Sequence, residues 1–198
     1  ANYYLYSIPN ESIQPATDFS KGKIQLGTLS PGGKHFAFVR ENNLFVIDLG
    51  ENKEIALTKD GQKNEIINGL SDWVYEEEFS NDRGFYWSPN GDRIAYYRFD
   101  ERRVKTFLVN HYGQLYPEWD YFKYPKAGEE NSKISIHIVS LADATTTTLQ
   151  TGNPEYIPRI KWTKDNDQLA VMRLNRHQNH LDIVSYDVTD PMDSGRVI

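Results

Sequence analysis

The chain has 198 residues, with 22 Lys and Arg against 28 Asp and Glu, and its net charge of -6 disfavours nucleic acid as a partner. Its 38% hydrophobic and 25% charged residues provide apolar surface for a folded core and argue against a disordered chain. The absence of cysteine excludes a disulfide scaffold, a thiolate zinc site and a cysteine nucleophile.

The first residues predict strands of an incomplete sheet. Residues 3–6 and Ile13 lie in short aromatic and β-branched runs, which are typical of strands. The opening residues lack the basic and apolar regions of a signal peptide. We therefore expect the chain to be a piece of a longer protein that begins within a sheet.

A recurring sequence pattern marks three hairpins. It occupies residues 29–38, 87–96 and 162–171, where it reads LSPGGKHFAF, WSPNGDRIAY and WTKDNDQLAV. Each copy places Pro, Gly, Asn or Asp between an apolar or aromatic residue and an apolar run. This arrangement is typical of a tight reversal between two strands.

Further strand-like runs follow each hairpin. They span residues 36–39, 44–49 and 55–58 in the first unit, 94–99, 104–109 and 134–141 in the second, and 169–174 and 181–188 in the third. Antiparallel meanders in series are typical of propeller blades, and a closed propeller has about 4 to 8 of them. The sequence therefore predicts an all-β fold, an arc of about three blades plus partial blades of a larger β-propeller. The pattern alone leaves open a β-sandwich with irregular hairpins.

Residues 71–79, SDWVYEEEF, interrupt the strand pattern. Three adjacent Glu are unfavourable in a strand, whereas Asp72 can cap a helix and Glu suits a helix interior. We predict a short helix insert, on which consecutive side chains diverge by only about 100°. Glu77 and Glu78 would then be able to converge on one cation. From the residues alone, a solvated charged face is the open alternative.

An aromatic insert at about residues 110–131 is predicted to form an arm that leaves the second meander. Aromatic side chains are enriched at protein interfaces, so the arm is a candidate contact surface. The alternative is that it folds back on its own blade. The aromatic residues that we single out are Tyr112, Tyr116, Trp119, Tyr121 and Phe122.

The histidines do not predict a metal site. Only His177 and His180 have a spacing that chelates a metal on a helix, and they lie in a predicted turn between strands. We therefore expect neither a metal nor another cofactor.

Three stretches together resemble the propeller of the dipeptidyl peptidase IV family, serine exopeptidases of the prolyl oligopeptidase group. They are residues 72–79 (DWVYEEEF), 87–91 (WSPNG) and 124–128 (YPKAG), and their order and spacing fit the family. The acidic stretch is specific, whereas many families share the propeller hairpins. The resemblance covers essentially the whole chain, and the lack of cysteine is closer to bacterial than to vertebrate members.

The resemblance implies that this chain is part of an eight-bladed propeller that caps an α/β-hydrolase domain. Glu77 and Glu78 would bind the α-ammonium of a peptide with a free N-terminus, so that dipeptides ending in Pro or Ala are released. Asp72, Trp73 and Tyr75 would support the helix. No Gly-x-Ser-x-Gly motif is present, so we expect no catalytic residue in this chain, which should be inactive without its own C-terminal hydrolase domain.

The same resemblance implies further properties of the longer protein. We expect a homodimer that uses the arm, and a periplasmic or extracellular location. Two other functions stay open. One is a prolyl tripeptidyl peptidase, and the other is an inactive relative whose propeller serves only as an interaction module.

Overall fold

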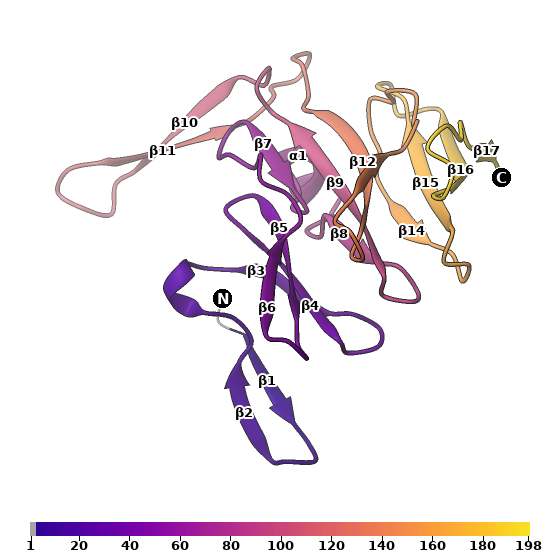
Figure 1. Cartoon of the computed structure of the whole chain (residues 1–198). Helices are drawn as coiled ribbons and strands as arrows, with labels where there is room; N and C mark the ends of the chain where they lie inside the picture. Colours follow the sequence, from indigo (N-terminus) through magenta and orange to yellow (C-terminus); the bar gives the residue numbers. More distant parts are fainter. Residues whose placement is uncertain (1–2) are drawn as a thin grey trace.

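The computed structural model describes residues 3–198, which form a series of antiparallel sheets (Figure 1). Three of these sheets have four or five strands, and we call them the first, central and third blades in chain order. The first blade contains β3 (Gln25–Leu29), β4 (His35–Arg40), β5 (Asn43–Asp48) and β6 (Lys53–Ala56). The central blade contains β7 (Ile66–Asn68), β8 (Phe85–Trp87), β9 (Arg93–Asp100), β12 (Lys133–Ser140) and β13 (Thr146–Thr148). The third blade contains β14 (Ile160–Trp162), β15 (Gln168–Leu174), β16 (Leu181–Asp187) and β17 (Arg196–Val197).

Two hairpins and two short helical segments complete the described chain. They are the hairpin β1 (Tyr4–Ser7) with β2 (Ser12–Pro15), the ribbon β10 (Thr106–His111) with β11 (Glu118–Lys123), the 3-10 turn Phe19–Lys21 and the helix α1 (Trp73–Glu77). The predicted all-β propeller arc with one short helix insert is confirmed. Among residues 3–198, no helix has the length and apolar composition that a membrane span requires.

The blades are held together by apolar residues on their facing surfaces. Tyr97 and Ile136 of the central blade pack in one buried cluster with Leu169 of the third. A second cluster joins Val39 of the first blade to Ile94 of the central blade. Fully burying a side chain of this size contributes about 1.5–3 kcal/mol, so each sheet depends on its neighbour for stability. Alternating apolar residues in the strands supply these faces.

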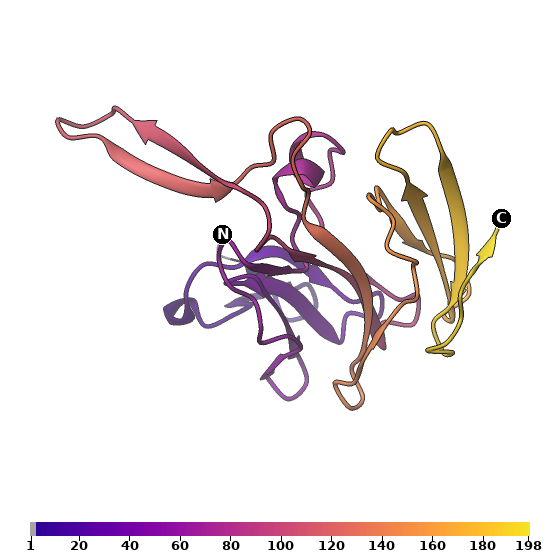
Figure 2. The same ribbon diagram turned by 90° about the horizontal axis from the view of Figure 1, so that it is seen from above.

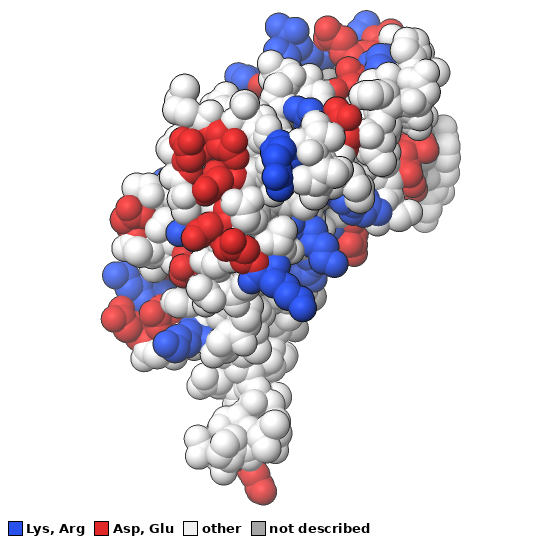
Figure 3. Space-filling view, turned by 90° about the vertical axis from the view of Figure 1, so that its right-hand side faces the viewer, with Lys and Arg blue, Asp and Glu red and all other residues white. Residues whose placement is uncertain are grey.

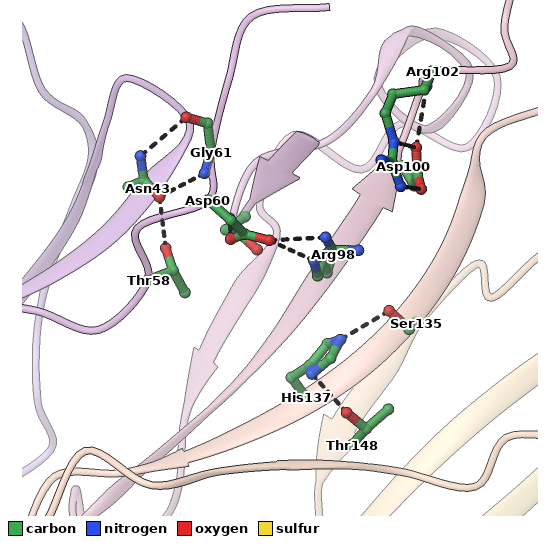
Figure 4. Close-up of polar contacts among 11 residues, drawn as sticks. Asn43, Thr58, Asp60, Gly61, Arg98, Asp100, Arg102, Ser135, His137 and Thr148 are labelled. Atoms are coloured by element: carbon green, nitrogen blue, oxygen red, sulfur yellow. Dashed lines mark hydrogen bonds and ion pairs between the residues drawn. The ribbon is translucent and has the colours of Figure 1, made fainter. Parts of the chain in front are cut away.

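One polar contact ties the connection that follows the first blade to the central blade, and another lies within the central blade (Figure 4). Asp60, in the connection before β7, accepts hydrogen bonds from Nε and Nη2 of Arg98 at 3.0 and 2.8 Å. In the neighbouring strand β12, the His137 ring lies between the hydroxyl groups of Ser135 and Thr148, at 2.8 and 3.0 Å. Burial lowers the pKa of His137 to about 4, so its ring is neutral at physiological pH.

The strand that pairs with β9 is interrupted, and this interruption creates the helix insert. β7 pairs with residues 98–100 of β9, and β8 pairs with residues 94–96. At the residue between them, the Gly69 N–H donates to the Tyr97 carbonyl at 3.0 Å, and the Tyr97 N–H donates to the Gly84 carbonyl at 2.8 Å. The chain therefore leaves the sheet after Gly69 and returns at Gly84, both opposite Tyr97.

The β10–β11 ribbon points away from the blades in both views (Figures 1 and 2). It begins at Thr106, earlier than the predicted arm of residues 110–131, because Thr106–His111 pairs with β11 instead of with the blade. Three of the singled-out side chains, Tyr112, Tyr116 and Trp119, are 75%, 81% and 63% exposed. Contacts with the blade occur near its base, where the Asn64 side chain donates to the Tyr121 carbonyl at 3.2 Å. Most of the ribbon does not fold back.

The surface seen from the side of the third blade carries acidic and basic side chains side by side (Figure 3). The β1–β2 hairpin, which projects at the bottom of Figures 1 and 3, is nearly free of charge. Its large apolar side chains, Tyr4, Tyr6, Ile8 and Ile13, are exposed. A two-stranded hairpin of this kind is marginally stable on its own.

Replacing Gly84 by Ala tests the closure of the insert. An added Cβ would lie 2.5 Å from the Gly69 carbonyl carbon and 2.5 Å from the Leu70 carbonyl oxygen, both backbone atoms. We expect Gly84→Ala to reduce the free energy of unfolding by about 1–3 kcal/mol, measured by chemical denaturation. Gly113→Ala is the matched control, because no atom lies within 4 Å of the added Cβ there. Equal stability of the two variants would contradict the prediction.

Candidate functional site

The acidic stretch forms a short capped helix that stands on the central blade. Asp72 has extended backbone geometry, and its Oδ1 accepts the Tyr75 N–H at 3.0 Å. The Glu76 N–H donates to the Asp72 carbonyl at 3.1 Å, and the Glu78 N–H donates to the Val74 carbonyl at 2.9 Å. Glu78 ends α1 in a right-handed helical conformation, with φ -88° and ψ -36°. Glu77 and Glu78 therefore share a helical backbone and are not in a strand.

Tyr75 anchors this helix in the core. Its side chain is 3% exposed, and its ring centroid lies 4.8 Å from that of Phe99 and 5.1 Å from that of Phe79. Its hydroxyl oxygen accepts the Ile157 N–H at 2.7 Å, so the helix is tied to the segment that leads into the third blade. Burial raises the pKa of Tyr75 well above its usual value, which keeps the hydroxyl protonated.

Trp73 lies on the other side of the helix, toward the base of the ribbon. Its ring meets the Tyr124 ring edge to face, with the centroids 4.4 Å apart. Tyr124 in turn packs near Phe107 and Phe122, whose ring centroids are 5.3 and 6.4 Å from its own. Phe122 is therefore a packing residue at the ribbon base, unlike the four exposed aromatic residues farther along it.

Two buried carboxyl groups, those of Asp72 and Glu101, lie near the start of the helix. Asp72 Oδ2 accepts a hydrogen bond from the Ser132 hydroxyl at 2.6 Å, just before β12, and burial raises the pKa of Asp72. Glu101 is 6% exposed, and burial together with the nearby Asp72 charge raises its pKa to about 7. The charge of Lys123 opposes this shift. Residues 100–103 read DERR and are all charged, yet the structure buries Glu101.

The glutamates themselves face solvent. Glu76, Glu77 and Glu78 are all exposed. Within the part of the chain that the structure describes, the carboxylates of Glu77 and Glu78 make no hydrogen bond or ion pair. Two neighbouring acceptor-only groups on a fixed helix are suited to a cation that has several N–H donors. No group of three or more potential metal ligands comes together among residues 3–198.

Sequence reasoning does not find the residues that hold the helix in place. Ser132 bonds to Asp72 across 60 positions, and Ile157 bonds to Tyr75 across 82. Arg159 donates from Nη2 to the Phe79 carbonyl at 2.6 Å across 80 positions. No motif marks these three residues, since each meets the helix only after the blades have packed.

Comparison with known proteins shows what this chain is similar to. The family model "Dipeptidyl peptidase IV (DPP IV) N-terminal region" matches residues 1–196. Dipeptidyl peptidase 4 of Trichophyton rubrum is 34% identical over 200 residues, which cover 95% of this chain and 25% of the relative. The dipeptidyl peptidase 4 of Arthroderma otae matches with the same identity and coverage.

A solved structure supports the same similarity. The crystal structure of Porphyromonas gingivalis dipeptidyl peptidase 4 superimposes with a TM-score of 0.91 at 37% sequence identity. The superposition covers 98% of this chain and 28% of that structure. The present chain thus spans about a quarter of the length of the curated relatives that it matches.

Replacing Glu101 by Gln tests the buried carboxyl near the helix cap. Because the folded pKa is about 7 and the unfolded pKa is near 4.5, Glu101 favours folding below pH 4.5, and this contribution is lost as the pH rises through 7. We expect Glu101→Gln to be about 1–3 kcal/mol more stable than the parent at pH 8 and similar at pH 4, by denaturation at both values.

Asp100→Asn is the control of opposite sign. The Arg102 guanidinium, 2.5 Å away, lowers the pKa of Asp100 to about 2, so its stabilising effect is present above pH 4 and is lost only in acid. This variant should therefore be less stable than the parent at pH 8. A loss of stability at pH 8 in both variants would contradict the assignment of Glu101.

Proposed function

Because the chain belongs to the family of dipeptidyl peptidase IV N-terminal regions, we propose that it is the substrate-gating propeller part of a serine exopeptidase that releases N-terminal dipeptides. The family membership predicted from the acidic stretch and the two accompanying motifs is confirmed. The observation that carries the functional proposal is the unpaired, exposed pair Glu77 and Glu78 on an anchored helix.

In the proposed mechanism, the two carboxylates hold the free α-ammonium of a peptide. An ammonium group has three N–H donors, and a hydrogen bond to a charged group contributes about 1.5–3 kcal/mol. With the N-terminus held at a fixed point, the peptide reaches the nucleophile with its second peptide bond. Since an α-amine has a pKa of about 7.7–8.0, binding should weaken when the amine loses its proton.

The bond-breaking residues are proposed to lie in an α/β-hydrolase domain outside this chain. The family resemblance implies a catalytic Ser, His and Asp there, and residues 1–198 contain no Gly-x-Ser-x-Gly motif. The preference for Pro or Ala at the second position is likewise proposed from the resemblance. A periplasmic or extracellular location is part of the same proposal.

We also propose that the longer protein is a homodimer and that the β10–β11 ribbon contributes to the interface. Support comes from Tyr112, Tyr116 and Trp119, which are at least 63% exposed on a ribbon that points away from the blades. Large aromatic residues are frequent in interface cores, where burial against a partner removes them from water.

Substitution of single glutamates tests amine binding in the full-length protein. Glu77→Gln and Glu78→Gln should each raise KM for peptides with a free N-terminus by about tenfold to a hundredfold, because each removes a charge-assisted contact. Steady-state kinetics with an Xaa-Pro substrate measure this effect. Glu76→Gln is the matched control, since Glu76 is equally exposed and has no proposed contact with substrate. Equal effects of all three variants would refute the assignment.

The length of the released product separates the peptidase functions. Mass spectrometry should show release of a dipeptide from a peptide with Pro at position two, and no release of a tripeptide from a second peptide with Pro at position three. Release of a tripeptide would instead identify a prolyl tripeptidyl peptidase. No release at all, with a folded protein, would favour the inactive interaction module.

Replacing Trp119 by Glu tests the proposed dimer. A charge placed in a buried apolar interface is costly, so Trp119→Glu should shift the full-length protein from dimer toward monomer in light scattering after size-exclusion chromatography. Met192→Glu is the control, because Met192 is 81% exposed and lies outside the ribbon. A dimer that persists at micromolar concentration in Trp119→Glu would exclude this residue from the interface.

A further inference from the structure

The glutamate helix is held by two blades at once. At its N-terminal end, the Asp72 side chain bonds to Ser132, which belongs to the central blade's connection to β12. At its C-terminal end, the contacts come from residues 157–159, which lead into β14 of the third blade. A helix of five residues has too few internal hydrogen bonds to be stable alone, so these outside contacts decide its orientation.

Arg159 makes the contact nearest to the glutamates along the chain. Its Nη2 donates to the Phe79 carbonyl at 2.6 Å, one residue after Glu78. Its Nη1 donates to the Pro158 carbonyl at 2.6 Å, which fixes the plane of the guanidinium group. An arginine suits this position because its rigid, permanently charged fork can bond to two carbonyl oxygens together. It also satisfies a backbone oxygen that the end of a helical segment leaves without a partner.

The backbone from which Arg159 reaches is itself fixed. Its carbonyl accepts the Met172 N–H of β15 at 2.9 Å. Three residues earlier, Tyr156 exchanges two backbone hydrogen bonds with Leu174, at 3.0 and 2.9 Å. Arg159 therefore lies in a segment whose backbone is paired with β15, and not in an unpaired loop. Its guanidinium ties the Phe79 peptide to the third blade.

The chain needs such a contact where α1 ends. Ser80 has a positive φ of 50°, and the Asn81 N–H returns to the Tyr75 carbonyl at 2.9 Å, so the backbone turns sharply just after Phe79. The Phe79 ring packs between Tyr75 and Tyr156, with centroid distances of 5.1 and 5.3 Å. Without Arg159, this turn would keep its apolar contact but lose the charged donor that sets the direction of the Phe79 carbonyl.

We propose that Arg159 is a positioning residue for Glu77 and Glu78, which holds the end of their helix to the third blade in the orientation that receives the substrate's α-ammonium. This inference rests on the proposed function and deepens it. Arg159 does not touch the substrate. It acts through the Phe79 peptide on the adjacent Glu78, so the recognition site is assembled by two blades instead of one.

The test is Arg159→Met in the full-length protein, with KM for a free-amine Xaa-Pro substrate as the readout. We expect KM to rise about tenfold, because a displaced binding group loses much of its effect, while kcat changes less than twofold. Partial misfolding lowers the amount of active enzyme and leaves KM unchanged, so KM reports positioning even if the variant folds poorly. Arg159→Lys keeps a cationic donor for the Phe79 carbonyl and should recover most of the loss.

A double-mutant cycle separates positioning from a general structural role. If Arg159 acts through the glutamates, Arg159→Met should change KM less than twofold when Glu77→Gln and Glu78→Gln are both already present. Arg173→Met is the matched control. Arg173 is also half-buried on the third blade and donates to the Thr151 carbonyl at 3.3 Å, but it has no contact with the helix. The KM of the Arg173→Met variant should equal that of the parent.

The outcomes distinguish this inference from the function on which it rests. If Glu77→Gln and Glu78→Gln leave KM unchanged, the proposed amine site is wrong, and the proposed role of Arg159 is wrong as well. If they raise KM but Arg159→Met does not, only the positioning role is overturned. An equal effect of Arg159→Met with and without the two glutamate substitutions, or an equal effect of Arg173→Met, would also overturn it.

Discussion

The close approach of Gly69 and Gly84 is the constraint on which the exposed glutamates depend. Both residues bond to Tyr97, so residues 70–83 leave and re-enter the sheet opposite a single residue of β9. The two backbone segments meet so tightly that only a residue without Cβ fits at Gly84. Because both ends of this excursion are fixed on a buried strand, the position of the helix that it carries is restricted.

Within this excursion, the polar backbone is satisfied from outside the helix, and the acidic side chains are left free. Asp72 caps the first turn, and the Tyr75 hydroxyl accepts a hydrogen bond from the segment that leads into the third blade. Arg159 donates a hydrogen bond to the Phe79 carbonyl. Buried polar groups need such partners, since an unsatisfied one costs about 1–3 kcal/mol. Nothing in the described chain pairs with Glu77 or Glu78, so these two carboxylates keep their capacity for a cation.

Blade packing and site geometry are therefore linked. The same interface that buries Tyr97 with Leu169 and Tyr186 also brings Ile157 and Arg159 to the helix. A shift between the central and third blades would move the helix contacts together with the core. Under the proposed gating function, this link would keep the proposed amine-binding groups aligned with the rest of the ring.

The sequence by itself determined the local chemistry of this protein. Turn residues after Leu29, Trp87 and Trp162 mark the hairpins, and Asp72 followed by the glutamates marks the helix, because turns and caps depend on neighbouring residues. Only the tertiary structure decided that Glu101 is buried, that the ribbon begins at Thr106, and that Ser132 and Arg159 hold the helix. These features arise from contacts between residues far apart in the chain, which form only when one blade packs against the next.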